Sequence, residues 1–330
     1  MTDPLGILFG FATTQIVYVA VRLGVPELLA DGARSGEELA EATGAHAPSL
    51  RRLLRGLASH GIVSEPEPDR YALTLGGQLL RTEVTRSAIL LFGAEQMWRA
   101  WGELEYSVRT GKPSFDKLTG ASSFEYFAAH PEQSELFQRA MSSHTAEVAP
   151  EIVAGYEFAS LATLVDVGGG DGTLLAAILH AVPTLQGVLY DAAAGLAAAP
   201  ARLRAAGVAD RCEVVAGDFF ATVPPGGDGY LLKSVIHDWD DARATRILEN
   251  CRLAGGTVLV VEPVLPPGPV TASPEQAYLA LSDLNMLVNT GGRERTEAEF
   301  RALYAAAGLD LVAVHEAGDY RILEGTPAPR

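Results

Sequence analysis

The chain contains little cysteine, with Cys212 and Cys251 the only two among its 330 residues. Two cysteines cannot form the disulfide framework of a small secreted domain, so we expect a reducing compartment, the cytoplasm. We interpret both side chains as buried thiols. The seven histidines show no His-x-x-x-His spacing and the cysteines no Cys-x-x-Cys spacing, so the sequence predicts no metal site.

Positive charge is scarce as well, because 25 Lys and Arg residues stand against 41 Asp and Glu residues, a formal net charge of -16. Binding of a polyanion relies on clustered Lys and Arg, so nucleic acid is disfavoured as a partner.

Long hydrophobic runs are also missing, since Thr13, Thr14 and Gln15 interrupt the apolar stretch 5–23. This stretch has no basic start and no cleavage site. We expect a helix against a partner surface, neither a membrane span nor a signal peptide.

The length and the 48% hydrophobic content predict a globular protein of two domains. Near the amino end, Ser35 and Glu38 have capping-box spacing. Leucines in residues 50–57 then follow the i, i+3, i+4, i+7 pattern of an amphipathic helix. Residues 62–63 and 71–73 flank a polar turn, as in a hairpin. Helix, turn, helix and hairpin in this order are typical of a winged helix.

Winged helices often bind DNA, and Arg51, Arg52 and Arg55 would lie on the second helix. Residues 1–95, however, hold eight Arg, no Lys and eleven acidic residues, so this module is slightly negative. We therefore favour a dimerisation role over DNA binding. A winged-helix regulator that senses a small ligand is the alternative from a different class of protein.

Helical patterns continue from about residue 85 to residue 156. Met97 and Trp101 are four residues apart, and Phe137 and Met141 have the same spacing. Such stripes belong either to a hydrophobic core or to the wall of an apolar pocket. Both interpretations remain open.

From Leu161 onward, short apolar runs alternate with longer Ala- and Leu-rich segments. This alternation predicts an α/β fold with a Rossmann-like, doubly wound parallel sheet, closed by a hairpin near the carboxyl end. The five expected parallel strands are 163–167, 187–190, 212–216, 229–232 and 257–261.

Ligands of such sheets bind beyond the carboxyl ends of the strands. A glycine turn that begins at Gly168 follows the first expected strand. Polar residues follow the other four, namely Asp191, Asp218, His237 and Glu262. The sequence therefore predicts a binding or catalytic site along this edge.

The glycine turn has the pattern Asp166-x-Gly168-x-Gly170-x-Gly172, which lacks the Gly-x-Gly-x-x-Gly spacing of a nicotinamide-binding loop. An acid two residues before the first glycine would repel a pyrophosphate but suits a ligand with an ammonium group, such as S-adenosylmethionine. An NAD-dependent oxidoreductase is kept as a rival interpretation.

Three motifs resemble the small-molecule O-methyltransferase family, which includes plant caffeate and isoflavone enzymes and bacterial natural-product tailoring enzymes. They are Leu-Val-Asp-Val-Gly-Gly-Gly at 164–170, Gly-Asp-Phe-Phe at 217–220 and Leu-Lys-Ser-Val-Ile-His-Asp-Trp at 232–239. Gly-Gly-Arg-Glu-Arg-Thr at 291–296 is similar to the same family near its carboxyl end. Ala192 and Ala193 depart from the family's Leu-Pro after the second strand, which concerns packing around the cofactor.

The resemblance covers nearly the whole chain and implies an S-adenosylmethionine-dependent enzyme that methylates a hydroxyl of a small aromatic molecule. It implies a homodimer with a winged-helix-like dimerisation domain at 1–95. A helical linker at 96–158 would contribute to the acceptor pocket, and a Rossmann-like cofactor domain would occupy 159–330. The implied cofactor contacts are Gly168, Asp191, Asp218, Phe219 and Lys233.

The resemblance also implies that His237 is the general base, with Glu262 and Glu294 beside it. A phenol has a pKa of about 10 and histidine one of about 6.5, so an unassisted proton transfer is uphill. A carboxylate next to His237 would favour the imidazolium and lower this barrier. The expected acceptor pocket is lined by Met97, Trp98, Phe137, Met141, Asp238, Met286 and Asn289.

Family relatives that perform C- or N-methylation, hydroxylation or decarboxylation remain alternatives. The presence of His237 weighs against those that need no base. A metal-assisted variant would need further ligands near His237 and Asp238, for which Asn289 is a poor donor.

Overall fold

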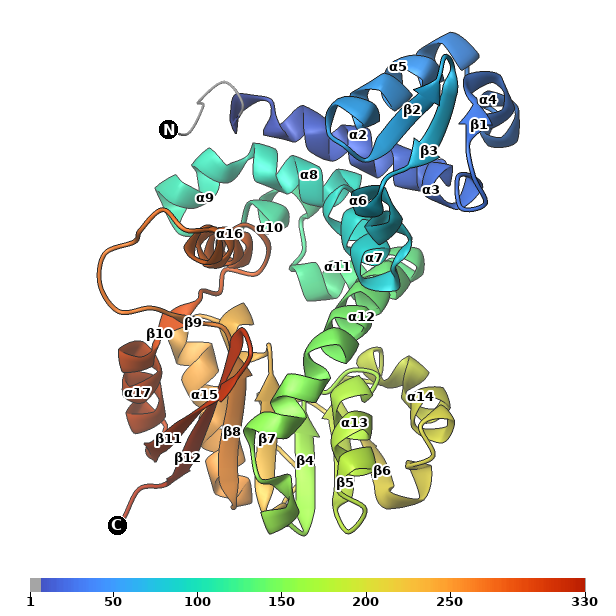
Figure 1. The fold of residues 1–330 in the computed structure, drawn as a ribbon. Coiled ribbons are helices and arrows are strands. Elements are labelled where there is room, and N and C mark those ends of the chain that lie inside the picture. The colour runs from blue at the N-terminus through green and yellow to red at the C-terminus, as the bar shows by residue number, and fades with distance from the viewer. Residues whose placement is uncertain (1–6, 330) are drawn as a thin grey trace. The chain divides into compact units, whose positions relative to one another are not determined.

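The computed structural model describes residues 7–329, which divide into an amino-terminal unit ending at Trp98 and a carboxyl-terminal unit beginning at Arg99 (Figure 1). The finer division into 1–95, 96–158 and 159–330 stays a prediction. Of the apolar stretch 5–23, residues 5 and 6 lie outside the described part, and most of the rest forms helix α2 (Gly10–Arg22). None of the described helices combines the length and the apolar character needed to cross a membrane.

The amino-terminal unit is mainly helical and carries a small antiparallel sheet with the order β1-β3-β2. Ser35 caps helix α4, since its Oγ accepts the Glu38 N–H at 3.1 Å and its own N–H donates to Glu38 Oε2 at 2.6 Å. The elements of this unit are α2, α3 (Val25–Leu28), β1 (Arg34–Ser35), α4 (Gly36–Thr43), α5 (Ala47–Ser59), β2 (Val63–Glu67), β3 (Arg70–Leu73), α6 (Leu75–Gln78) and α7 (Glu83–Phe92). The predicted capping box, helices and hairpin are confirmed.

Helix α5 carries the arginines that would face DNA in a winged-helix reader. Its apolar side buries Leu50, Leu54 and Leu57 in the core of the unit. On another side, Arg51 donates to Asp69 Oδ1 at 2.8 Å and to Glu37 Oε2 at 3.1 Å. Arg51 is thus engaged by acids of its own unit, which favours a structural role for it.

The carboxyl-terminal unit begins with helices and continues as a sheet with helices on both faces (Figure 1). Helix α8 (Glu95–Gly102) crosses the boundary between the units. The helices that follow are α9 (Leu104–Thr110), α10 (Ser114–Thr119), α11 (Ser123–Ala129), α12 (Pro131–Gly155), α13 (Thr173–Ala181), α14 (Ala199–Ala205), α15 (Asp241–Ala254), α16 (Pro274–Asn289) and α17 (Glu297–Ala306).

Seven strands form the main sheet in the order β11-β12-β8-β7-β4-β5-β6. Five of them are parallel neighbours, whereas the hairpin β11–β12 joins β8 in antiparallel direction. The strands are β4 (Thr163–Val167), β5 (Gln186–Asp191), β6 (Cys212–Ala216), β7 (Gly229–Lys233), β8 (Thr257–Glu262), β11 (Leu309–Ala317) and β12 (Tyr320–Pro327). The predicted α/β class, the five parallel strands and the closing hairpin are confirmed. A separate parallel pair joins β9 (Val264–Leu265) to β10 (Arg295–Thr296).

The sheet has a hydrophobic core on each face, because successive strand residues point to opposite sides. Leu164 belongs to the core formed with α12, α13 and α14, whereas Val165 and Val167 belong to the core formed with α15 and α17. Because helices cover both faces of the sheet, its polar side chains gather at the edge formed by the carboxyl ends of the parallel strands.

Candidate active site

A tight glycine turn connects β4 to α13 at this carboxyl edge. Gly168, Gly170 and Gly172 have φ angles of 73°, 57° and 79°, a region that disfavours residues with a Cβ. At Gly169 a Cβ would come within 2.5 Å of Asp166 Oδ2. The turn therefore depends on glycine, and residues 168–170 remain partly exposed, so that a ligand can approach the backbone closely.

Two acids lie next to this turn. Asp191, at the end of β5, accepts the Gly170 N–H on Oδ2 at 2.8 Å. Asp166 is only 2% exposed, and its Oδ2 has no hydrogen-bond partner among the described residues. Burial, reinforced by the Asp191 charge, raises the pKa of Asp166 to about 7. This arrangement of acceptor groups fits a ligand that presents hydroxyl donors or positive charge, as the ribose and the ammonium group of S-adenosylmethionine do.

Phe219 lies against the first glycine of the turn, since a Cβ on Gly168 would be 3.7 Å from Phe219 Cε1. The Phe219 ring meets the Trp239 ring edge-on at 6.1 Å. The neighbouring Asp218 is exposed and accepts the Phe220 N–H on Oδ1 at 2.8 Å. Gly168, Asp218 and Phe219 are thus brought together, in a place suited to a flat aromatic base such as adenine.

Lys233 is the last residue of β7. Its Nζ donates to Thr145 Oγ1 at 3.3 Å and lies 5.2 Å from the centre of the Tyr320 ring. Burial lowers the pKa of Lys233 to about 8, although the charges of Glu262 and Asp166 oppose this effect. A buried cation on the same sheet edge as the glycine turn can hold the anionic part of a ligand.

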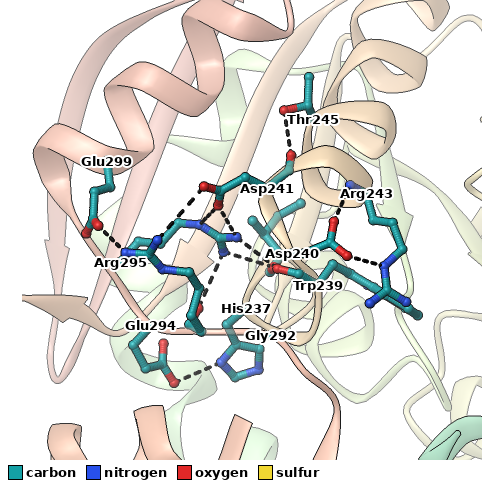
Figure 2. A network of polar contacts seen from close by, with 12 residues as sticks. His237, Trp239, Asp240, Asp241, Arg243, Thr245, Gly292, Glu294, Arg295 and Glu299 are labelled. Carbon is teal, nitrogen blue, oxygen red and sulfur yellow. Dashed lines mark hydrogen bonds and ion pairs between the residues drawn. The ribbon is translucent and has the colours of Figure 1, made fainter. Parts of the chain in front are cut away.

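His237 follows β7 in a short 3-10 turn (Ile236–Asp238) and contacts two buried carboxylates. Its Nδ1 lies 3.1 Å from Glu294 Oε1, the contact drawn in Figure 2, and 3.4 Å from Glu262 Oε2. Both glutamate side chains are 0% exposed, whereas the His237 side chain is 13% exposed. Nε2 makes no hydrogen bond to any of residues 7–329. The imidazole is therefore held by one nitrogen and leaves the other one for a ligand.

The two carboxylates change the proton affinity of this imidazole. Burial alone would lower the pKa of His237, but the Glu262 charge and the hydrogen bond with Glu294 outweigh burial and raise it to about 10. Burial acts in the opposite sense on Glu262 and raises the pKa of that carboxyl to about 7. Burial also raises the pKa of Asp238 to about 6. On Glu294, the contacts with His237 outweigh burial and lower the pKa.

Glu262 has a second role in shaping the turn. Its Oε1 accepts three consecutive backbone N–H groups, from Val235 at 3.1 Å, Ile236 at 2.9 Å and His237 at 3.2 Å. Ser234 makes this possible with a φ of 53°, because a left-handed residue followed by a right-handed one turns successive N–H groups toward a single anion. Glu262 therefore fixes the backbone of His237, whereas Glu294 contacts only its ring.

His237, Glu262 and Glu294 are also the described residues that could hold a metal ion, since their ligand atoms lie within 4.8 Å of one another. The 3.1 Å separation of Nδ1 from Glu294 Oε1 is that of an ordinary N–H···O hydrogen bond. This contact orders the ring without an ion. The expectation of no metal stays a prediction.

The residues predicted to line an acceptor pocket are spread over several elements. Phe137 and Met141 lie on α12 and Met286 and Asn289 on α16, while Met97 and Trp98 end the amino-terminal unit. The Phe137 ring stacks on the Phe127 ring with 4.7 Å between the ring centres. The ring centres of Trp98 and Phe11 are 6.3 Å apart. Met97 and Met286 are buried. Their role as a pocket wall stays a prediction.

Asn289 presents a polar atom within this group. Its Nδ2 donates to Asn285 O at 3.0 Å and to Asn285 Oδ1 at 2.8 Å, which fixes the orientation of the amide. Its buried Oδ1 has no hydrogen-bond partner among the described residues. A buried oxygen of this kind suits a donor group on a bound molecule.

Sequence reasoning missed three residues around His237. Ser282 donates to Glu294 Oε1 at 2.6 Å, and Asp283 Oδ1 accepts the Glu294 N–H at 2.9 Å. Arg295 is 1% exposed and contacts the His237 loop. The motif at 291–296 contains Arg295 and could have pointed to it, but no local pattern singles out Ser282.

Comparison with known proteins matches both units of the chain. A family model described as the O-methyltransferase domain matches residues 101–310, and one described as the O-methyltransferase dimerisation domain matches residues 5–83. Phenazine O-methyltransferase PhzM of Lysobacter antibioticus is 42% identical over 98% of this chain and 95% of that protein.

Solved structures agree with these matches. The mitomycin 7-O-methyltransferase MmcR superposes with a TM-score of 0.92 at 40% identity, over 98% of this chain and 96% of that one. The O-methyltransferase NcsB1 from neocarzinostatin biosynthesis, solved with S-adenosylmethionine and 2-hydroxy-5-methyl naphthoic acid, has a TM-score of 0.87 at 36% identity, over 99% of each chain. N-methyltransferases also occur among the relatives.

Proposed function

Since the chain belongs to the family of S-adenosylmethionine-dependent O-methyltransferases, we propose that it methylates a hydroxyl of a small aromatic molecule with His237 as the general base. The resemblance seen in the sequence motifs is confirmed by these matches, and the cofactor is S-adenosylmethionine. The O-methyltransferases named above act on aromatic molecules such as a phenazine, which supports an aromatic acceptor here.

One observation carries the proposal: the His237 imidazole lies beside two buried carboxylates with its Nε2 left unbonded by residues 7–329. Because Nδ1 faces carboxylate oxygens, it carries the proton of the neutral ring, and in that form Nε2 is the atom that can accept another one. The pKa of about 10 at His237 matches that of a phenol, so the proton moves between groups of similar affinity. The carboxylates then stabilise the imidazolium that forms.

The cofactor supplies an activated methyl group on a sulfonium centre. We propose that Gly168, Asp191, Asp218, Phe219 and Lys233 bind it, since they gather at the carboxyl edge of the sheet. His237 Nε2 would receive the phenolic proton and hold the oxygen in line for attack. Glu262 would keep the His237 backbone in place, and Glu294 would stabilise the charged ring.

We propose that the acceptor lies near α12 and α16. Helix α16 carries Met286 and Asn289, and it also carries Ser282, which contacts Glu294. Helix α12 carries Phe137 and Met141 together with Thr145, the partner of Lys233. Both helices therefore connect predicted pocket residues with groups at the sheet edge. Asp238 completes the proposed wall within the carboxyl-terminal unit, and the part assigned to Met97 and Trp98 stays a prediction.

The direct test is mass spectrometry of a panel of phenols and quinols incubated with the protein and S-adenosylmethionine. We expect at least one acceptor to gain a single methyl group, and no gain when the cofactor is omitted. A matched panel of aromatic amines tests the N-methylation alternative. Methylation of amines with no reaction of any phenol would contradict the proposal.

Replacement of Asp191 by Asn tests the cofactor contacts separately. Loss of a hydrogen bond to a charged acceptor costs about 1.5 kcal/mol, so we expect the Kd for S-adenosylhomocysteine in calorimetry to rise about tenfold. Asp191 accepts two backbone N–H groups, those of Gly170 and Ala192. Asp228→Asn is the matched control, because Asp228 likewise accepts two, at 3.0 and 2.8 Å, but precedes β7 rather than following a strand. Equal affinities in wild type and Asp191→Asn would remove Asp191 from the binding site.

We further propose a homodimer, supported by the match of residues 5–83 to the dimerisation domain. A cytoplasmic location is proposed because Cys212 and Cys251 are free thiols. A ligand-sensing regulator would shift DNA in a gel assay, and the acidic composition of residues 1–95 leads us to expect no shift.

A further inference from the structure

Residues 292–295 make close contacts and hydrogen bonds with the loop that carries His237. Gly292 packs so closely that a Cβ there would overlap the His237 carbonyl oxygen. The same oxygen accepts the Arg293 N–H at 2.9 Å, and the ring contacts Glu294 at 3.1 Å. Backbone and ring of one histidine are thus held by three successive residues.

Arg295 adds hydrogen bonds to carbonyl oxygens on both sides of the histidine (Figure 2). Its Nη1 donates to the Ile236 carbonyl oxygen at 3.2 Å, and its Nη2 donates to the Trp239 carbonyl oxygen at 2.8 Å. One rigid guanidinium therefore spans the turn whose middle residue is His237. A lysine could not bridge these carbonyls, because its single ammonium lacks the planar fork of donors.

Asp241 supplies the counter-charge for this buried cation. Its Oδ1 accepts from Arg295 Nε at 3.0 Å and from Nη2 at 2.7 Å. The Arg295 side chain is 1% exposed, whereas that of Asp241 is 63% exposed. A buried charge is costly unless it is paired and hydrogen-bonded, and here every guanidinium nitrogen has a partner. Because all three guanidinium nitrogens are bonded, the position of Arg295 next to the turn is fixed.

We propose that Arg295, held by Asp241, is a positioning residue for His237: it sets the carbonyls on either side of the histidine and thereby keeps the ring between its carboxylates. The inference rests on the proposed function, in which His237 Nε2 meets the acceptor oxygen. A displacement of about 1 Å of a reacting group can cost as much as about 10²-fold in rate. A loosened turn therefore lowers turnover even when the cofactor site is intact.

The variant Arg295→Lys keeps the charge and removes the bridge. We expect kcat to fall about tenfold, with a KM for S-adenosylmethionine close to that of the wild type. Asp241→Asn keeps the buried arginine and a neutral acceptor for it at a mostly exposed position, so it should show the same pattern more weakly. Arg211→Lys is the matched control, since Arg211 likewise donates to backbone carbonyls, those of Leu179, Val182 and Leu185.

A second readout distinguishes positioning from mere stability and does not depend on activity. The titration of His237, followed by nitrogen NMR of the ring, reports whether the imidazole still lies between its carboxylates. In Arg295→Lys we expect its pKa to move down toward the ordinary histidine value of about 6.5, and Arg211→Lys should leave it unchanged.

Wild-type kcat and an unshifted His237 titration in both Arg295→Lys and Asp241→Asn would overturn the inference. A lower melting temperature with unchanged kcat per folded molecule would do the same. If His237→Ala retains full turnover, the proposed function fails instead, whatever the Arg295 variants show.

Discussion

Replacing His237 by alanine is expected to lower turnover by a factor of about 10² to 10⁴, the usual contribution of a general base. In the proposed mechanism His237 Nε2 accepts the phenolic proton. Alanine has no group that can accept this proton, so the proton loses its acceptor. Affinity for S-adenosylhomocysteine should stay close to that of the wild type, because the glycine turn and Asp191 do not contact the imidazole. Steady-state kinetics with an accepted phenol, together with calorimetry, measures both quantities.

His315→Ala is the matched control for this experiment. His315 also pairs with a glutamate, since its Nε2 lies 2.8 Å from Glu324 Oε2, but it belongs to the β11–β12 hairpin. We expect turnover of this variant to remain near the wild-type value. Full activity in His237→Ala would mean that alignment alone drives methyl transfer and that the imidazole is dispensable.

Replacing Glu294 by Gln is expected to lower the high-pH plateau of kcat/KM by about 10²-fold. The change keeps the shape of the side chain but removes a charge, and a hydrogen bond to a charged group contributes about 1.5–3 kcal/mol, or roughly 10- to 100-fold in rate. Glu294 Oε1 is shared by His237 Nδ1 at 3.1 Å and Ser282 Oγ at 2.6 Å, so a neutral amide also loosens this junction. The effect therefore falls at the upper end of that range.

The pH dependence of kcat/KM should also change in a definite direction when Glu294 is replaced. With a pKa of about 10, His237 of the free enzyme is protonated near neutral pH, and the reacting pair must lose one proton before the phenolate can attack. In the wild type, kcat/KM should therefore rise with pH and level off near pH 10. Without the Glu294 charge the pKa of His237 is lower, so the rise ends at a lower pH and the plateau is smaller.

Glu324→Gln serves as the control, because Glu324 likewise bonds a histidine but away from the carboxyl edge. The same phenol is used throughout, so that the titration of the acceptor is common to every profile. A profile of Glu294→Gln that levels off at the wild-type pH would show that Glu294 does not set the proton affinity of His237.

The two glutamates next to His237 are unequal, although they appeared equivalent in the sequence. Glu262 ends β8 and binds three backbone N–H groups, so its loss would change the course of the chain at His237. Glu294 binds the ring and a serine hydroxyl, so its loss changes mainly the charge. The Gln variant of Glu294 is therefore the cleaner probe of proton transfer.

The sequence by itself determined the sheet and most of its carboxyl edge. Strands 163–167 and 212–216 were predicted with the bounds observed, because short apolar runs between helical segments identify the strands of a parallel sheet. Asp191 and Glu262 followed from this, since residues at the ends of parallel strands share one edge of the sheet. The roles of these residues in binding and catalysis came from the family resemblance and remain to be tested.

The family resemblance implied that Glu262 and Glu294 lie beside His237, but only the tertiary structure decided which contacts hold the ring and its backbone. Glu294 lies 57 positions away and Ser282 12 positions before Glu294. Arg295 reaches the carbonyls of Ile236 and Trp239 across a similar separation. Helical and strand periodicities report neighbours within one element, whereas these contacts form where residues of α16 and of the segment 292–295 meet each other and the turn that follows β7. Such packing is set by the fold as a whole, and no local pattern in the chain encodes it.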